Sequence, residues 1–158
     1  MTVVGCTGHQ RMPPEARGYA DREIRLLLGA VGPSLAGVSA LAAGADQLFA
    51  NAVREFGGQL HVVIPSDGYE TTFTDPEDLR SYQRLLAEAS TVVTLSYPEP
   101  SEAAFFAAGK DVVDKCDVLL AVWDGKPAQG LGGSADVVSY ARSHGKTVEV
   151  VWPVGVSR

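Results

Sequence analysis

Three short loops rich in small residues carry most of the polar groups that could bind a ligand. Each follows an apolar run, and their sequences are Gly5-Cys6-Thr7-Gly8-His9, Ala43-Gly44-Ala45-Asp46 and Gly130-Leu131-Gly132-Gly133-Ser134. Glycines let the backbone approach an anion closely, and the free N–H groups at the start of a helix point toward it. The third loop opens a predicted helix, so we expect Gly132, Gly133 and Ser134 to hold a phosphate. A glycine-rich turn with a serine cap is the alternative.

The first two loops offer groups for the rest of such a ligand. Thr7 and the N–H groups around Gly8 could contact phosphate or ribose, whereas His9 could bind the ligand or only cap its own loop. In the second loop, Gly44 adjoins Asp46, whose carboxylate could accept hydrogen bonds from ribose hydroxyls. A carboxylate at a helix start is also favoured by the helix dipole alone, so both interpretations of Asp46 stay open.

Four charged residues outside these loops are candidate accessory groups. They are Arg11, Arg80, Arg84 and Asp124. The arginines are anion partners in the functional interpretation and solvated surface residues in the structural one. Asp124 either forms the rim of a pocket or belongs to a turn.

These loops need a scaffold that brings them together, and strand and helix patterns alternate along the chain. Runs rich in β-branched residues predict strands at 3–6, 38–42, 60–64, 91–95, 118–123 and 147–151. Helical periodicity predicts helices at 15–31, 45–56, from Pro76 onward, 102–115 and 134–143. With right-handed crossovers, this order predicts a three-layer α/β/α Rossmann-like sandwich with a mostly parallel six-stranded sheet. Loops that follow parallel strands share one edge of such a sheet, where ligands bind.

One irregular segment, 65–74, is long enough to act as a lid over that edge. Two of its residues, Tyr69 and Phe73, either stack on the base of a ligand or pack the segment down.

Composition narrows the class of protein. The 158 residues fit a single domain, 1–158, and 46% hydrophobic with 20% charged residues indicates a folded chain. A net charge of −6 argues against a general nucleic-acid binder. The two cysteines, Cys6 and Cys116, give neither a disulfide framework nor a metal-binding pattern, so we expect no metal and no cofactor. Nothing resembles an export signal or a membrane span, which predicts a cytoplasmic protein with no membrane partner.

The loops together resemble a known family. The residues Gly5-x-Thr7-Gly8-His9, Ala43-Gly44-Ala45-Asp46, Trp123-Asp124-Gly125-Lys126 and Gly132-Gly133-Ser134-Ala135-Asp136 are similar to motifs of the DprA/LOG-like superfamily of Rossmann-type nucleotide-binding proteins. The nearest resemblance is to small bacterial stand-alone members. It implies a small nucleotide-type ligand and a homo-oligomer. The DNA-binding role of DprA-type members is not expected to transfer, given the acidic balance.

Whether the protein is an enzyme stays open. Family members of the Lonely Guy type hydrolyse the N-glycosidic bond of nucleoside 5′-monophosphates with the motif P-G-G-x-G-T-x-x-E. Here Asp136 falls near the first acidic position, and Val137 stands where the second glutamate belongs. Cleavage through an oxocarbenium-like transition state needs a carboxylate. The leading hypothesis is therefore a nucleotide-binding protein, such as a ligand sensor, and the alternative is a phosphoribohydrolase that uses Asp136.

Overall fold

Six parallel strands form one sheet in the computed structural model of the chain, which describes residues 1–127, 131 and 133–158. The strands are β1 (Thr2–Gly8), β2 (Leu35–Ser39), β3 (Gln59–Ile64), β4 (Thr91–Thr94), β5 (Val118–Val122) and β6 (Thr147–Val150). Their order is β4-β3-β2-β1-β5-β6, and every neighbouring pair is parallel. The predicted Rossmann-like sheet is confirmed.

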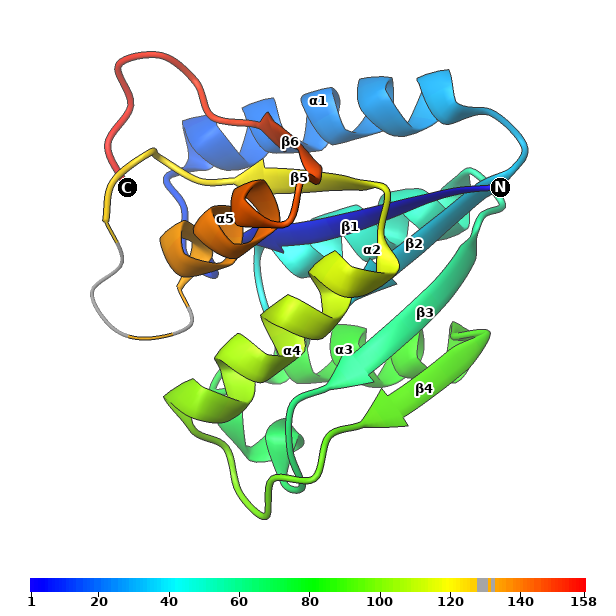
Figure 1. Cartoon of the computed structure of the whole chain (residues 1–158), viewed down its shortest axis with the longest axis vertical. Helices are drawn as coiled ribbons and strands as arrows, with labels where there is room; N and C mark the ends of the chain where they lie inside the picture. Colours follow the sequence, from blue (N-terminus) through cyan, green and yellow to red (C-terminus); the bar gives the residue numbers. More distant parts are fainter. Residues whose placement is uncertain (128–130, 132) are drawn as a thin grey trace.

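Helices cover both faces of this sheet and complete the three layers (Figure 1). They are α1 (Pro14–Val31), α2 (Ala45–Glu55), α3 (Pro76–Glu88), α4 (Glu102–Lys115) and α5 (Ser134–Ser143), with a short 3-10 helix, η1 (Tyr69–Thr72). Helix α2 packs between α1 and α3 on one face, and α4 packs on α5 on the other. Buried side chains four residues apart, Ala16, Ala20, Ile24 and Leu28, form the apolar stripe of α1.

The connections reverse the order of the strands next to β1. From β1 the chain runs outward to β4, then returns through α4 to β5 on the other side of β1. The order of strands therefore reverses between β1 and β5. In open parallel sheets, ligands bind at such a reversal, beyond the carboxyl ends of the strands. These ends point to the left in Figure 1, the side on which the C-terminus also lies.

The bounds of two strands differ from the prediction. The expected strand at 38–42 is wrong at both ends, because Leu35–Ser39 is the segment that pairs with β1 and β3. Gly37 made this segment look like a loop in the sequence, because glycine is uncommon within strands. A Cβ there would lie 2.6 Å from Val53 Cγ2, so a glycine is needed where α2 packs on the sheet. Strand β1 also continues through Gly8, which makes Thr7 and Gly8 strand residues rather than loop residues.

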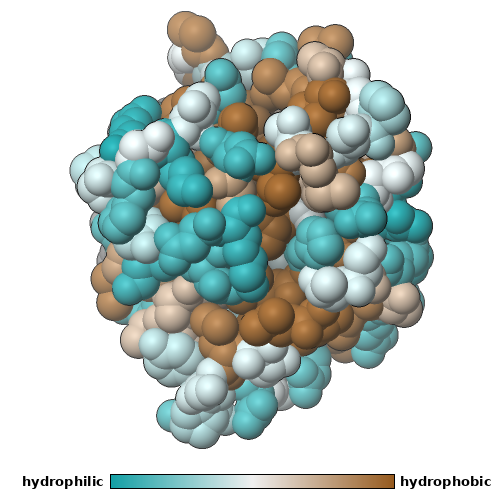
Figure 2. Space-filling model, turned by 45° about the vertical axis from the view of Figure 1, so that its right-hand side comes forward, coloured by the Kyte–Doolittle hydropathy of each residue, from teal (hydrophilic) through white to brown (hydrophobic). Residues whose placement is uncertain are grey.

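The edge strand β4 leaves apolar surface exposed. Val92 and Val93 are 46% and 41% exposed. Figure 2 shows apolar patches among the hydrophilic surface of one face of the molecule. None of the helices in the described part of the chain is long and apolar enough to cross a membrane.

Candidate functional site

A cavity of about 480 Å³ opens at the carboxyl edge of the sheet, between the ends of β1, β2, β3 and β5 and the helices α4 and α5. Sequence-predicted residues on its lining are Thr7, Gly8, His9, Asp46, Gly133 and Ser134. The first two loops and the described part of the third thus meet at one site. Gly132, the remaining residue predicted to hold phosphate, lies outside the described residues.

Two of the predicted binding glycines are needed for packing. A Cβ on Gly8 would lie 2.4 Å from the Cβ of Ala45, and a Cβ on Gly44 would lie 2.4 Å from the carbonyl oxygen of Gln10. Gly44 also has a φ of +80°, which side chains strongly disfavour. The Ala45 N–H donates to the His9 carbonyl oxygen at 3.2 Å. The first two loops therefore pack against each other, and this contact uses an N–H group at the start of α2.

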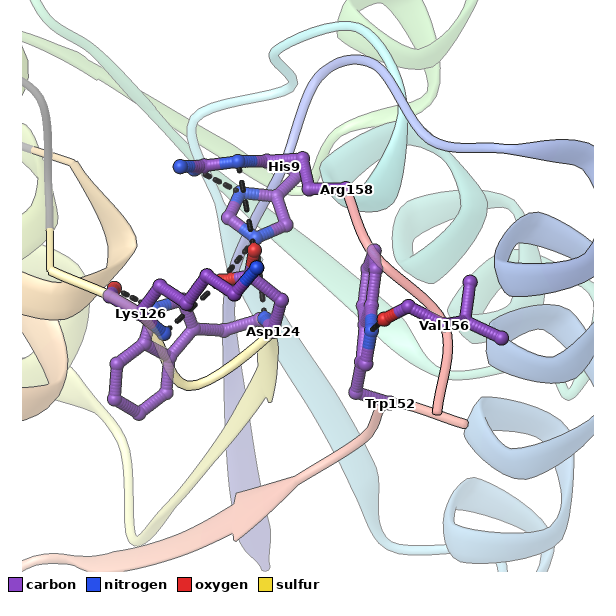
Figure 3. Close-up of polar contacts among 7 residues, drawn as sticks. His9, Asp124, Lys126, Trp152, Val156 and Arg158 are labelled. Atoms are coloured by element: carbon purple, nitrogen blue, oxygen red, sulfur yellow. Dashed lines mark hydrogen bonds and ion pairs between the residues drawn. The ribbon is translucent and has the colours of Figure 1, made fainter. Parts of the chain in front are cut away.

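His9 is buried in a network that joins distant parts of the chain (Figure 3). Its Nε2 accepts a hydrogen bond from the backbone N–H of Asp124 at 3.2 Å and lies 3.4 Å from Asp124 Oδ1. Its Nδ1 lies 3.3 Å from Nη1 of Arg158, and Trp152 packs on the ring edge to face at 5.3 Å between centroids. Both nitrogens of His9 thus have polar partners within the protein.

The charges of this network favour a neutral imidazole. Burial lowers the pKa of His9 and Arg158 lowers it further, with a partial offset from Asp124. Burial acts to raise the pKa of Asp124, but the Lys126 N–H, Arg158 and His9 outweigh it, so this pKa lies below its ordinary value. Oδ2 of Asp124 has no hydrogen bond, yet Arg158 Nε lies 3.6 Å away. The Asp124 carboxylate therefore remains ionised beside a compensating cation.

Asp46 is also a buried polar residue of the site, but it has fewer polar partners than His9. It lies in the first turn of α2, is 7% exposed and lines the cavity. Oδ2 accepts a long hydrogen bond of 3.4 Å from the Ala42 N–H. No N–H or O–H group of the described residues donates to Oδ1. The described residues therefore leave one oxygen of this carboxyl group unsatisfied, which is costly for a buried carboxylate.

Burial dominates the protonation of Asp46 and its neighbours. It raises the pKa of Asp46 to about 7, with partial offsets from the Ala42 N–H and the Cys6 thiol. Burial and the nearby Asp46 charge also raise the pKa values of Cys6 and Tyr69 well above their ordinary ranges. The cavity therefore holds a carboxyl group that binds a proton more readily than an ordinary aspartate, between a neutral thiol and a neutral phenol.

The start of α5 forms another part of the cavity wall. Gly133 is the N-cap residue, and its carbonyl accepts the N–H groups of Asp136 and Val137. The N–H groups of Ser134 and Ala135 have no partner among the described residues. Ser134, Ala135 and Val137 line the cavity, whereas Asp136 is absent from the described lining. The structure thus brings Val137, and not Asp136, to the site.

The three predicted accessory arginines lie elsewhere. Arg80 pairs with Glu77 on the exposed surface of α3, and Arg84 pairs with Glu88 and donates to Asn51. Arg11 lines a second cavity of about 580 Å³. This cavity adjoins the first, with which it shares Gln10, Ala42, Tyr69 and Thr72.

The segment 65–74 is not irregular throughout, and its aromatic residues pack against the rest of the protein. It contains η1, and Tyr69 is buried against Phe73, Tyr82 and Phe105 at centroid distances of 5.4, 5.6 and 6.2 Å. Packing is thus the outcome for Tyr69 and Phe73, although Tyr69 also lines the cavity.

Sequence reasoning missed one cation of the site. Arg158 lines the cavity and contacts both His9 and Asp124, which lie 149 and 34 positions earlier in the chain. No local pattern in the sequence predicts a contact between residues so far apart in the chain.

Comparisons with known proteins identify the fold. No protein-family model and no curated protein matches the chain. Among solved structures, DNA processing protein A of Helicobacter pylori is 19% identical with a TM-score of 0.70, over 99% of this chain and 68% of that one. The same protein of Streptococcus pneumoniae is 20% identical with a TM-score of 0.67, over 94% of this chain and 50% of that one. The molybdenum cofactor binding protein of Rippkaea orientalis is 16% identical with a TM-score of 0.60, over 94% and 75%.

The chain therefore shares the Rossmann-like fold of these solved structures, as the alternation of strands and helices predicted. It spans half the length of the Streptococcus pneumoniae protein.

One expectation about partners is wrong. The net charge of −6 led us to exclude general nucleic-acid binding. The Helicobacter pylori protein, which shares this fold, is described by its single-stranded DNA binding mode. An acidic overall balance cannot exclude such a ligand, because net charge says nothing of how charges are distributed around a cavity.

Proposed function

We propose that the cavity at the carboxyl edge binds a nucleotide or a nucleotide-derived small molecule. The phosphate would lie at the start of α5, and the base would lie toward the ends of β2 and β3. A protein that holds or senses such a ligand fits this arrangement. The observation that carries the proposal is that one cavity joins a helix N-terminus to a buried carboxyl group, one oxygen of which has no N–H or O–H donor among the described residues.

Several groups at the α5 end suit an anion. The N–H groups of Ser134 and Ala135 lie in the first turn, where the helix dipole favours negative charge. Two cationic residues, Lys126 and Arg158, line the same cavity. A phosphate there would receive backbone hydrogen bonds and charge compensation together.

The fold adds general support. The cavity lies at the reversal of strand order, where parallel sheets bind ligands. The two kinds of similar protein, one described with single-stranded DNA and one with the molybdenum cofactor, are consistent with a ligand site in this fold.

Two substitutions at one position test the phosphate site. Gly133 has an extended backbone, with φ of −69° and ψ of 171°, which both aspartate and asparagine adopt as helix caps. Gly133→Asp adds a negative charge at the anion site, whereas Gly133→Asn adds nearly the same shape without the charge. We expect Gly133→Asp to weaken mononucleotide binding at least about tenfold relative to Gly133→Asn, because like charges repel.

Isothermal titration calorimetry with a panel of nucleoside monophosphates, and with a short single-stranded oligonucleotide, measures this difference. Circular dichroism checks that both variants are folded. The proposal fails if nothing in the panel binds, or if the two variants bind equally well.

A second candidate, cleavage of an N-glycosidic bond, is favoured by one observation. The cavity contains a carboxyl group, that of Asp46, whose pKa of about 7 suits a general acid. Chromatography of AMP and GMP incubations would detect the free base. Loss of base release in Asp46→Asn, but not in Asp136→Asn, assigns the chemistry to Asp46, and the reverse result assigns it to Asp136. If the wild-type protein releases no base, this candidate is excluded.

A further inference from the structure

We propose that Asp46 selects the ligand by its ring, accepting hydrogen bonds from two adjacent N–H groups of the kind found on the 2-amino-4-oxo edge of guanine and pterin rings. This inference rests on the proposed binding of a nucleotide-type ligand. It adds which ring the cavity prefers and which residue determines that preference.

The hydrogen-bond inventory of Asp46 is the first argument. An ionised carboxylate has about four acceptor positions, and here a long bond from the Ala42 N–H and a hydrogen bond with the Cys6 thiol occupy two of them. Oδ1 has no N–H or O–H donor among the described residues. The residue lines the cavity, but Oδ1 has almost no accessible surface. The carboxyl group must therefore turn toward the cavity when a bound molecule supplies the missing donors.

The neighbours of Asp46 do not compensate its charge. The titratable groups that act on it or feel its charge are the Cys6 thiol of β1 and the Tyr69 phenol of η1. Both groups are neutral at physiological pH, because burial raises their pKa values. No cation of the described residues forms an ion pair with Asp46. The partner that the carboxylate lacks is therefore a donor rather than an acceptor.

The same end of the cavity suits a flat ring. Tyr69 and Phe105, together with Pro65, line it, and these residues provide apolar surface on the β3 side of Asp46. The start of α5 follows β5, which is two strands away from β2 in the sheet. Two strand spacings are about 10 Å. A nucleoside monophosphate spans a comparable distance between its phosphate and the outer edge of its base.

The two oxygens of a carboxylate match a ring edge with two parallel donors. Guanine and pterin present a ring N–H and an adjacent amino group, whereas hypoxanthine lacks the amino group. Adenine has an amino donor next to an acceptor nitrogen, and cytosine has the same arrangement. An acceptor opposite a carboxylate oxygen is repelled. Adenine and cytosine are therefore disfavoured both by the missing donor and by this repulsion.

The test compares ligands that differ at this edge. Calorimetry on the wild-type protein would use GMP, IMP, XMP and AMP, together with a pterin monophosphate. We expect GMP to bind at least about tenfold more tightly than IMP and AMP, because each lost charge-assisted hydrogen bond costs at least that factor. The relative affinities of GMP and the pterin monophosphate then distinguish the two sources of the ring.

Asp46→Asn provides a matched variant of the same shape. Its amide donates one hydrogen bond and accepts one, an arrangement that fits the N–H and carbonyl edge of xanthine. We expect GMP binding to weaken at least about tenfold and XMP binding to strengthen, so that the preference of the protein reverses. A purely structural role of Asp46 would weaken all ligands together and could not produce this reversal.

The failures are distinguishable. If GMP, IMP and AMP bind equally to the wild-type protein, the inference about Asp46 is overturned while the proposed function stands. If nothing in the panel binds, the proposed function fails and the inference falls with it. Should Asp46→Asn not fold, the wild-type comparison of GMP with IMP decides the question alone.

Discussion

His9 and Asp46 are both buried polar residues at the carboxyl edge of the sheet, yet their surroundings differ. His9 has polar partners on both ring nitrogens, supplied by Asp124 and Arg158. Asp46 has one long hydrogen bond on Oδ2 and no N–H or O–H donor on Oδ1 from the described residues. The first arrangement holds the fold together. The second costs stability, and buried groups of that kind are typical of sites that meet a ligand.

The two residues should also respond to pH in opposite directions. The pKa of His9 is lowered by folding, so acidification below 6.5 protonates the unfolded chain first and reduces stability. The pKa of Asp46 is raised by folding from 3.8 to about 7, so the folded chain keeps its proton longer. The contribution of Asp46 to stability is therefore present at low pH and lost as pH rises toward 7.

The largest predicted effect is this loss at Asp46. Between about pH 4 and pH 7 its cost should reach roughly 4 kcal/mol, and Asp46→Asn should remove it. The measurement is urea unfolding of both proteins across this range, with the stability difference plotted against pH. Cys6 and Tyr69 stay neutral throughout because their pKa values are raised. A difference that does not change with pH would show that Asp46 titrates as an ordinary exposed carboxyl group.

A smaller effect is expected from the contact between the first two loops. Gly44→Ala would combine an unfavourable φ with a Cβ only 2.4 Å from the Gln10 carbonyl oxygen. We expect a loss of about 3 kcal/mol in the free energy of unfolding. Gly125→Ala is the control, since its φ of +84° is similar but no atom lies within 4 Å of the added Cβ. About 1 kcal/mol is expected there. Equal losses at both positions would mean that backbone strain, rather than loop packing, requires Gly44.

The secondary structure was only partly predictable from the sequence. The alternation of strands and helices was sufficient to predict the fold, and the predicted bounds of α4 and α5 match the structure. Strand β2 was misplaced because Gly37, needed against Val53, looks like a loop residue. A glycine that permits close packing and one that permits ligand approach look the same in a sequence.

The sequence likewise predicted some features of the candidate site and not others. Parallel strands end at one edge, so the meeting of the loops followed from the order of the elements. The helix dipole offered a sufficient reason for Asp46, and its missing donors became visible only in three dimensions. Arg158 could not have been found, since its contacts with His9 and Asp124 depend on how the final segment folds back.

Asp124→Asn separates stability from binding on the His9 side. The substitution keeps an acceptor for the Lys126 N–H but removes the charge that faces Arg158. We expect a loss of about 2 kcal/mol in the free energy of unfolding. Because Asp124 is absent from the described lining of the cavity, nucleotide affinity should change less than about threefold, within the range of indirect effects. Chemical denaturation and calorimetry on one preparation measure both quantities. A large loss of affinity with unchanged stability would show that Asp124 serves ligand binding, as proposed for Asp46, rather than stability.

The smallest effect, at Arg158, tests the electrostatics of the network most directly. Arg158→Gln removes the cation beside His9 Nδ1 while keeping a hydrogen-bonding side chain. After burial, that cation is the main cause of the lowered pKa of His9, and in the variant it would no longer offset the Asp124 charge. The pKa of His9 should therefore rise in the variant, which NMR titration of the imidazole resonances can measure. His61 and His144, which lie outside this network, serve as internal controls in the same spectra. Stability should change by at most about 1 kcal/mol, since Arg158 is partly exposed. An unchanged His9 pKa would mean that burial alone keeps the ring neutral, so that Arg158 remains available to a bound phosphate.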